Sequence, residues 1–235
     1  MTYSSSILDL AAIERSLIDV QSRFEALNAR FEEPRDPLVD AVRENMLNGY
    51  ALVDRYVTDG VDLFDLQQVN RMLDINTTVL CGNVPARRDE VAEHIRATER
   101  RFFDTTEGNI RELLEWYEGH RDQSPWKVAA GTFVRILSTP QLFIEGNTRS
   151  ASLIASYLLM RAGLPPFVLT VANAEAYFNP SAVIRKMPRH SVSSLFRLPK
   201  IKKKYAEFLK AQADTRFLLA HPTGARPARR GEAGS

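Results

Sequence analysis

The sequence predicts an all-α fold. Apolar residues recur at three- and four-residue spacings along most of the chain, which is the period of amphipathic helices. Turn-forming residues interrupt this pattern at Pro34, at Asp59-Gly60 and at Gly163. Hydrophobic residues make up 44% of the 235 residues, which is enough for a real core, and one main domain is the simplest organisation.

The first three helices follow from this spacing. Residues 7–31 keep the helical period, so we expect one long amphipathic helix before the proline break at 34–37. Its apolar stripe must cover either the domain or a partner chain. A second helix is expected over residues 38–57 and a third over residues 63–80, with a break at Asp59-Gly60.

Residues 83–108 are polar and strongly charged, so a helix and a loop both fit them. For the part from His94 to Phe103 we favour an ordinary exposed helix. Further on, Ser124 followed by Pro125 is typical of a helix start, and apolar residues continue to Leu137.

Two more helices complete the prediction. A mostly apolar helix is expected over residues 150–162, where Gly163 ends it. A last amphipathic helix is expected over residues 200–219. The tail, residues 221–235, lacks apolar side chains to bury and is expected to be disordered.

Charge and composition exclude several classes of protein. Lysine plus arginine number 31 and aspartate plus glutamate 29, so no global field attracts nucleic acid or an anionic membrane. The single cysteine, Cys81, excludes an internal disulfide and fits a small buried residue. No basic start precedes an apolar stretch, and no apolar run reaches the roughly 18 residues of a membrane span. We therefore expect a cytoplasmic protein.

The loop between the helices predicted over residues 124–137 and 150–162 carries the strongest functional signal. Gly146 allows a ligand to approach the backbone, and Asn147 can cap the helix that follows, whose first N–H groups carry partial positive charge. Arg149 adds a planar cation suited to phosphate oxygens. Glu145 is placed to hold Mg²⁺, which usually binds one or two carboxylates together with phosphates. These residues predict a phosphate or nucleotide site.

This loop resembles the active-site motif of the Fic (Fido) family, HxFx(D/E)GNGRxxR, whose members mostly transfer AMP from ATP to a protein hydroxyl. The matching residues are Phe143, Glu145, Gly146, Asn147 and Arg149. The resemblance extends over about residues 38–200. It implies a Fic-like helical bundle over residues 37–200, flanked by an N-terminal helix (1–36), a C-terminal helix (201–220) and the tail (221–235).

The resemblance also implies roles for individual residues. Glu145 would hold Mg²⁺ together with ATP or another nucleotide, and Asn147 would fix the loop. The residues expected to bind the nucleotide are Gly146, Asn147, Thr148, Arg149, Ser150 and Tyr177. Tyr177 lies where the family often has a tyrosine near the adenine pocket, and a place in the core is the alternative.

Three departures from the motif affect the expected chemistry. Gln141 stands in place of the histidine base, Thr148 replaces the second glycine, and Ser152 replaces the final arginine. Glutamine does not titrate near neutral pH, so general-base assistance worth roughly 10²–10⁴ in rate would be missing. If the reaction occurs, Gln141 would orient the incoming hydroxyl. We therefore expect degenerate or altered transferase activity.

Other elements of the family are weak in this sequence. The family's β-hairpin flap, which pins a target protein by strand addition, would fall over residues 95–108. The inhibitory pattern (S/T)xxxE(G/N) has no strict match, and residues 40–45 come nearest. None of the histidines has the register of the motif; they are His94, His120, His190 and His221. The alternative function is a non-catalytic interaction module whose N-terminal helix binds a partner.

Overall fold

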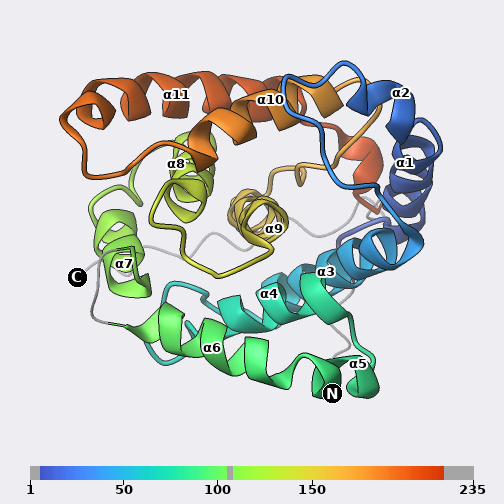
Figure 1. Cartoon of the computed structure of the whole chain (residues 1–235), viewed down its shortest axis with the longest axis horizontal. Coiled ribbons are helices and arrows are strands. Elements are labelled where there is room, and N and C mark those ends of the chain that lie inside the picture. The colour runs from blue at the N-terminus through green and yellow to red at the C-terminus, as the bar shows by residue number, and fades with distance from the viewer. Residues whose placement is uncertain (1–5, 105–107, 220–235) are drawn as a thin grey trace, which may run out of the picture.

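Helices form almost all of the regular structure in the computed structural model, which describes residues 6–104 and 108–219 (Figure 1). Within these residues the chain has eleven α-helices and one short 3₁₀ helix. The extended pairing found there consists of two isolated bridges, Leu8 with Leu218 and Thr139 with Pro188. The all-α prediction is confirmed.

The helices follow one another in the order α1 Leu10–Ser22, α2 Phe24–Asn28, α3 Asp40–Thr58, α4 Arg71–Cys81, α5 Pro85–Glu90, α6 Ala92–Phe103, α7 Ile110–Glu118, α8 Pro125–Leu137, α9 Asn147–Arg161, α10 Ala174–Arg185 and α11 Val192–Ala211, followed by the 3₁₀ helix η1 Thr215–Phe217.

Helix α9 lies at the centre of the bundle, with α8, α3 and α4 packed around it (Figure 1). All its residues from Ser150 to Met160 are buried, as expected of a helix that is apolar on most sides. The close approach of α9 to α3 depends on Gly49 of α3, because a Cβ at that position would overlap the Leu153 side chain of α9. The start of α9 therefore has a fixed place in the core.

The N-terminal region differs from the single long helix expected over residues 7–31. The chain bends at Arg23, which separates α1 from α2. After the bend, Phe24 and Phe31 pack against Phe178 of α10, with ring centroids 6.3 and 4.8 Å from that ring. Upstream, Ile13 and Leu17 of α1 enter the main core, while Val20 belongs to the smaller cluster around Phe24 and Phe31. The apolar stripe therefore covers the domain itself and is not free for a partner chain.

Local hydrogen bonds explain two further corrections. The helix expected over residues 63–80 begins only at Arg71. Before it, the side chains of Asp62 and Asp65 accept hydrogen bonds from nearby backbone N–H groups, at 3.0 and 2.7 Å, and such turns compete with a helix. The last helix was expected over residues 200–219, yet α11 begins at Val192, after Ser191 caps its first turn.

Within the charged stretch, the described residues 83–104 include the two helices α5 and α6, so the helical interpretation of His94 to Phe103 is confirmed. The expected flap is not found in the described part of residues 95–108, since the chain is helical to Phe103. The expected tail, residues 221–235, lies outside the described residues. Within the described ranges, no helix has both the length and the hydropathy to cross a membrane.

Candidate functional site

The loop that joins α8 to α9 turns sharply at Gly146. This glycine has φ +72° and is the N-cap of α9, a left-handed conformation that residues with a Cβ rarely adopt. A Cβ there would also lie 3.0 Å from Asn76 Nδ2 and 3.2 Å from Val79 Cγ2, both on α4. Asn147 was expected to cap α9, but it is the first helical residue. The loop therefore requires glycine at this position.

The Asn147 side chain reaches back into the loop and holds it closed. Its Oδ1 accepts a hydrogen bond from the Phe143 N–H at 2.9 Å. Its Nδ2 donates to the Phe143 carbonyl at 2.8 Å and to Gln141 Oε1 at 3.0 Å. Asn147 is 5% exposed, so these bonds replace solvent for a buried amide.

Both ends of the Gln141 amide are engaged within this loop. Its oxygen accepts from Asn147, and its Nε2 donates to the Leu137 carbonyl at 3.1 Å. The Gln141 carbonyl in turn accepts from Arg101 at 3.0 Å. Gln141 lines the cavity described below, but its polar atoms stabilise the loop. Orienting a substrate hydroxyl would require one of these bonds to break.

The first turn of α9 presents backbone donors. No residue that the structure describes accepts a hydrogen bond from the N–H of Asn147, Thr148 or Arg149, and Gly146 offers no side-chain cap. Behind the turn, Asn76 donates to the Glu145 carbonyl at 2.8 Å and to the Ser150 hydroxyl at 3.1 Å. Free N–H groups at a helix N-terminus form a site for an anion.

Arg149 adds a positive charge that no carboxylate neutralises. Its guanidinium donates to the Val79 carbonyl at 2.6 Å, and it forms no ion pair among the described residues. Burial lowers its pKa, while Glu145 and Tyr177 oppose that shift. A half-buried cation held by a neutral carbonyl would be stabilised by a bound anion.

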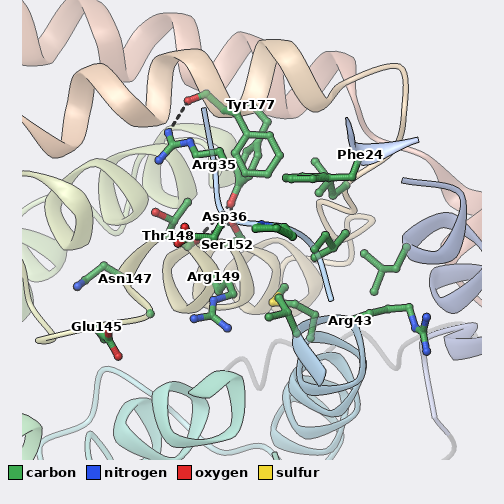
Figure 2. Close-up of a pocket in the computed structure, with 18 of the residues that line it drawn as sticks. Phe24, Arg35, Asp36, Arg43, Glu145, Asn147, Thr148, Arg149, Ser152 and Tyr177 are labelled. Carbon is green, nitrogen blue, oxygen red and sulfur yellow. Dashed lines mark hydrogen bonds between the residues drawn. The ribbon is translucent and has the colours of Figure 1, made fainter. Parts of the chain in front are cut away.

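These groups line a cavity of about 450 Å³ (Figure 2). This volume lies within the range of roughly 300–1,000 Å³ that is usual for small-molecule sites. The charged residues that line it are Arg35, Asp36, Arg43, Glu145, Arg149 and Arg185. Arginines outnumber carboxylates in this set, so the cavity favours an anionic ligand.

Part of the wall comes from the segment between α2 and α3, which the sequence did not place near the loop. Arg35 donates to the Phe178 carbonyl at 3.1 Å, and its buried Nε has no hydrogen-bond partner. Arg43 and Arg185 are each paired with a carboxylate, at 2.7 Å to Asp40 and 3.3 Å to Glu33. Arg35 is therefore a second candidate contact for an anion.

Tyr177 is one of the residues that line the cavity, and it also belongs to the hydrophobic core. The hydroxyl lies 2.6 Å from Ser152 Oγ and donates to the Thr148 carbonyl at 3.3 Å. The ring stacks on Phe167, with centroids 5.1 Å apart. Burial raises the pKa of Tyr177 to about 12, so the hydroxyl stays neutral at physiological pH. Ser152, which stands in place of the family's final arginine, thus forms part of a neutral hydroxyl pair.

Of two other expected site residues, Ser150 lies outside the cavity and Glu145 lies at its rim. Ser150 is fully buried against Asn76 and does not line the cavity. Glu145 lies at the rim with its side chain 69% exposed, and its Oε2 is 3.8 Å from His94 Nε2 of α6. Within residues 6–104 and 108–219, no group of three or more His, Cys, Asp or Glu residues could hold a metal alone. A magnesium ion at Glu145 would therefore depend on phosphate oxygens for most of its ligands.

The remaining histidines lie away from this cavity or outside the described residues. His120 accepts or donates a hydrogen bond at the Trp116 carbonyl, 2.7 Å away, and His190 lies 3.4 Å from Glu112. His221 falls in the part of the chain that the structure does not describe. Only His94 is thus brought to the loop among the described histidines, and it contacts the rim.

Comparison with known proteins finds similarity to solved structures, including two of Fic-1 from C. elegans. No family model and no curated protein matches the sequence. The structure is similar to a fragment of Fic-1 from C. elegans, residues 134–508, with a TM-score of 0.44 and 17% identity over 89% of this chain and 61% of that chain. A variant of the same fragment gives a TM-score of 0.43 and 16% identity over 86% and 60%. This chain thus spans about three fifths of those structures.

Proposed function

We propose that this chain is a Fic-like protein that binds ATP or another nucleotide with Mg²⁺ in the cavity beside α9, and that its AMP transfer to protein hydroxyls is degenerate or altered. One observation carries the proposal. The uncapped first turn of α9 and the unpaired Arg149 line a cavity of about 450 Å³, at a loop that resembles the Fic motif.

Phosphate oxygens fit this wall on electrostatic grounds. The N–H groups of residues 147–149 would donate to one phosphate, as backbone groups do in other anion-binding turns. The planar guanidinium of Arg149 matches the geometry of phosphate oxygens, and a bound anion would offset the cost of its burial. Thr148 contributes its N–H but crowds the site more than a glycine would.

Glu145 is the residue that would hold Mg²⁺. Its carboxylate is exposed at the rim, so it is free to turn toward a metal that is mainly bound by phosphate. The ion would neutralise phosphate charge during binding. Tyr177 would form part of the cavity wall, while its ring stays packed on Phe167.

The loop offers no group suited to take a proton from an incoming hydroxyl. Gln141 does not titrate near neutral pH, and its amide is bonded to Leu137 and Asn147. His94 contacts Glu145 at the rim and does not line the cavity. These contacts support binding without ordinary transfer.

Calorimetric titration with ATP, with and without Mg²⁺, tests the binding. We expect Arg149→Ala to weaken ATP binding by about tenfold or more, because it removes a charge-assisted contact. Arg161→Ala is the matched control, because Arg161 lies on the same helix but pairs with Asp62 outside the cavity. Absence of binding in the wild-type protein, or equal weakening by the two variants, would contradict the proposal.

A labelling experiment tests the missing base. We expect the wild-type chain to transfer no AMP to itself or to a protein mixture, and Gln141→His to gain label. If the variant binds ATP yet gains no label, Gln141 is not the main cause of inactivity, and Thr148, Ser152 or a missing flap also blocks the reaction.

A further inference from the structure

A second cavity, of about 230 Å³, lies between α7, α8 and α11, on residues that line no part of the first. Trp116 of α7 forms one wall. Gly131 of α8 allows the indole to lie directly on that helix, since a Cβ at this position would overlap the Trp116 ring. The same Cβ would lie 3.1 Å from Lys202 Cδ of α11. Glycine thus brings an aromatic ring and a lysine stem together on α8.

Two cations flank Trp116, and Glu112, which pairs with Arg189, is the carboxylate whose charge acts on Arg135. The guanidinium carbon of Arg135 lies 5.4 Å from the ring centroid, and Lys202 Nζ lies 5.7 Å from it. Neither side chain forms an ion pair or donates a hydrogen bond to any described residue. Contact of a cation with an aromatic face stabilises it by roughly 0.5–2 kcal/mol. This is less than the free energy of hydration that a charge loses when it is buried.

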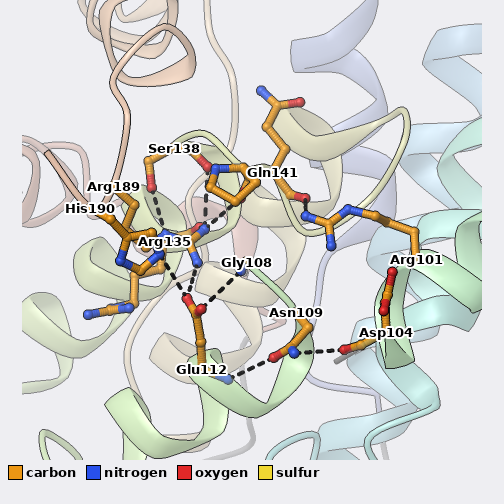
Figure 3. Close-up of polar contacts among 11 residues, drawn as sticks. Arg101, Asp104, Gly108, Asn109, Glu112, Arg135, Ser138, Gln141, Arg189 and His190 are labelled. Atoms are coloured by element: carbon orange, nitrogen blue, oxygen red, sulfur yellow. Dashed lines mark hydrogen bonds and ion pairs between the residues drawn. The ribbon is translucent and has the colours of Figure 1, made fainter. Parts of the chain in front are cut away.

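Glu112, the carboxylate whose charge acts on Arg135, is already engaged (Figure 3). Glu112 accepts from Arg189 at 3.0 Å and from the Gly108 N–H at 3.1 Å, and it lies 3.4 Å from His190. Arg189 also lines the second cavity, and it is 7% exposed. No Asp or Glu in the described part of the chain lines this cavity. Its net charge is therefore positive.

Nearby positive charges add to the cost of burying both cations. Burial lowers the pKa of Arg135 to about 10; the charge of Arg189 adds to this effect, while the charge of Glu112 opposes it. Burial also lowers the pKa of Lys202, with further contributions from Lys127 and Arg135. An anion between the cations would reverse the charge contribution to both shifts.

We propose that this second cavity binds the phosphate group of a small molecule. Arg135 supplies a planar fork that matches two phosphate oxygens, and Lys202 supplies a point charge from the opposite helix. The volume of about 230 Å³ holds a phosphate with a compact organic group. Such a site is distinct from the proposed nucleotide cavity and does not depend on it.

Fluorescence of Trp116 gives a local readout. Trp126 is the other tryptophan and does not line the cavity, so the experiment uses the full chain with Trp126→Phe. We expect inorganic phosphate and pyrophosphate to change Trp116 emission with saturation, at constant ionic strength. Arg135→Gln and Lys202→Gln should each weaken this binding about tenfold, by removing a charge-assisted contact.

Lys203→Gln is the matched control, because it removes the same charge from the next position of α11, where the side chain is exposed. The response should persist in Arg149→Ala, which separates this site from the nucleotide cavity. A response that does not saturate, or that Lys203→Gln weakens as much as Lys202→Gln, overturns the proposal. Circular dichroism of each variant verifies the fold. Arg135→Lys keeps the positive charge at this position and removes the planar fork, so it is a milder change than Arg135→Gln.

Discussion

Replacing Asn147 tests whether the loop is held by this one amide. Asn147→Ala removes three hydrogen bonds, two with the Phe143 backbone and one with Gln141, at 2.8–3.0 Å. At about 1 kcal/mol each, we expect a loss of about 3 kcal/mol in the free energy of unfolding. For a chain of this length, that corresponds to a fall in Tm of roughly 6–12 °C. The variant should also bind ATP more weakly, because the first turn of α9 loses its fixed position.

Asn147→Asp is a more specific test, because the side chain keeps its shape. The acid can still accept from the Phe143 N–H, but it places an oxygen against two acceptors, the Phe143 carbonyl and Gln141 Oε1. These acceptors disfavour the ionised form, so the folded-state pKa of the new acid should exceed its unfolded value of about 3.9. The stability of the variant should therefore be greater at low pH and should fall as pH rises through the folded-state value.

Urea unfolding of wild type, Asn147→Ala and Asn147→Asp at several pH values measures these differences. A loss below about 1 kcal/mol in Asn147→Ala would refute the reasoning, because it would mean that the three bonds contribute little. A constant difference between wild type and Asn147→Asp across the pH range would show that the two acceptors do not face the new carboxylate.

Two further predictions concern the same region and the Arg189 network. Gly146→Ala should lose more stability than Gly163→Ala in urea unfolding, because both glycines have φ +72° but only a Cβ at 146 would meet other atoms within 4 Å. Each substitution costs about 1–2 kcal/mol for the backbone conformation alone. Equal losses would contradict the close contact of Gly146 with α4. For Glu112, burial raises the pKa, but hydrogen bonds from Gly108 and Arg189 outweigh it and lower the pKa below 4.5. Glu112→Gln should lower the free energy of unfolding by about 2 kcal/mol, and this difference from wild type should have its full size above pH 4.5. The difference should shrink as pH falls through the folded-state pKa of Glu112. A difference that grows on acidification would refute this assignment.

Local sequence signals predicted the helices that frame the site. Ser124 and Pro125 marked the start of α8 correctly, because both act on the first helical turn alone. The start of α9 was placed at residue 150, three residues too late. Asn147 has a side chain that often caps helices, and only the folded loop shows that it bonds backward to Phe143.

The walls of the cavity depend on contacts between distant segments, which a single sequence does not reveal. Arg35 reaches the site because Phe24 and Phe31 pack on Phe178, more than 140 residues away. Asn76, which holds the loop carbonyl of Glu145, stood in the sequence as a polar residue within an apolar helix pattern. A buried amide at such a position is a signal that could have pointed to a partner.

Because the segment between α2 and α3 forms one wall of the first cavity, the docking of the N-terminal region and the occupancy of that cavity are thermodynamically linked. A ligand that contacts Arg35 would hold this region onto the domain and protect it from proteases. Conversely, a partner or a truncation that displaces α1 and α2 from the domain would open the cavity to water from that side and weaken ligand binding. Helix α1 lies before the bend at Arg23, and Arg35 lies after it, so the bend is part of the connection between them.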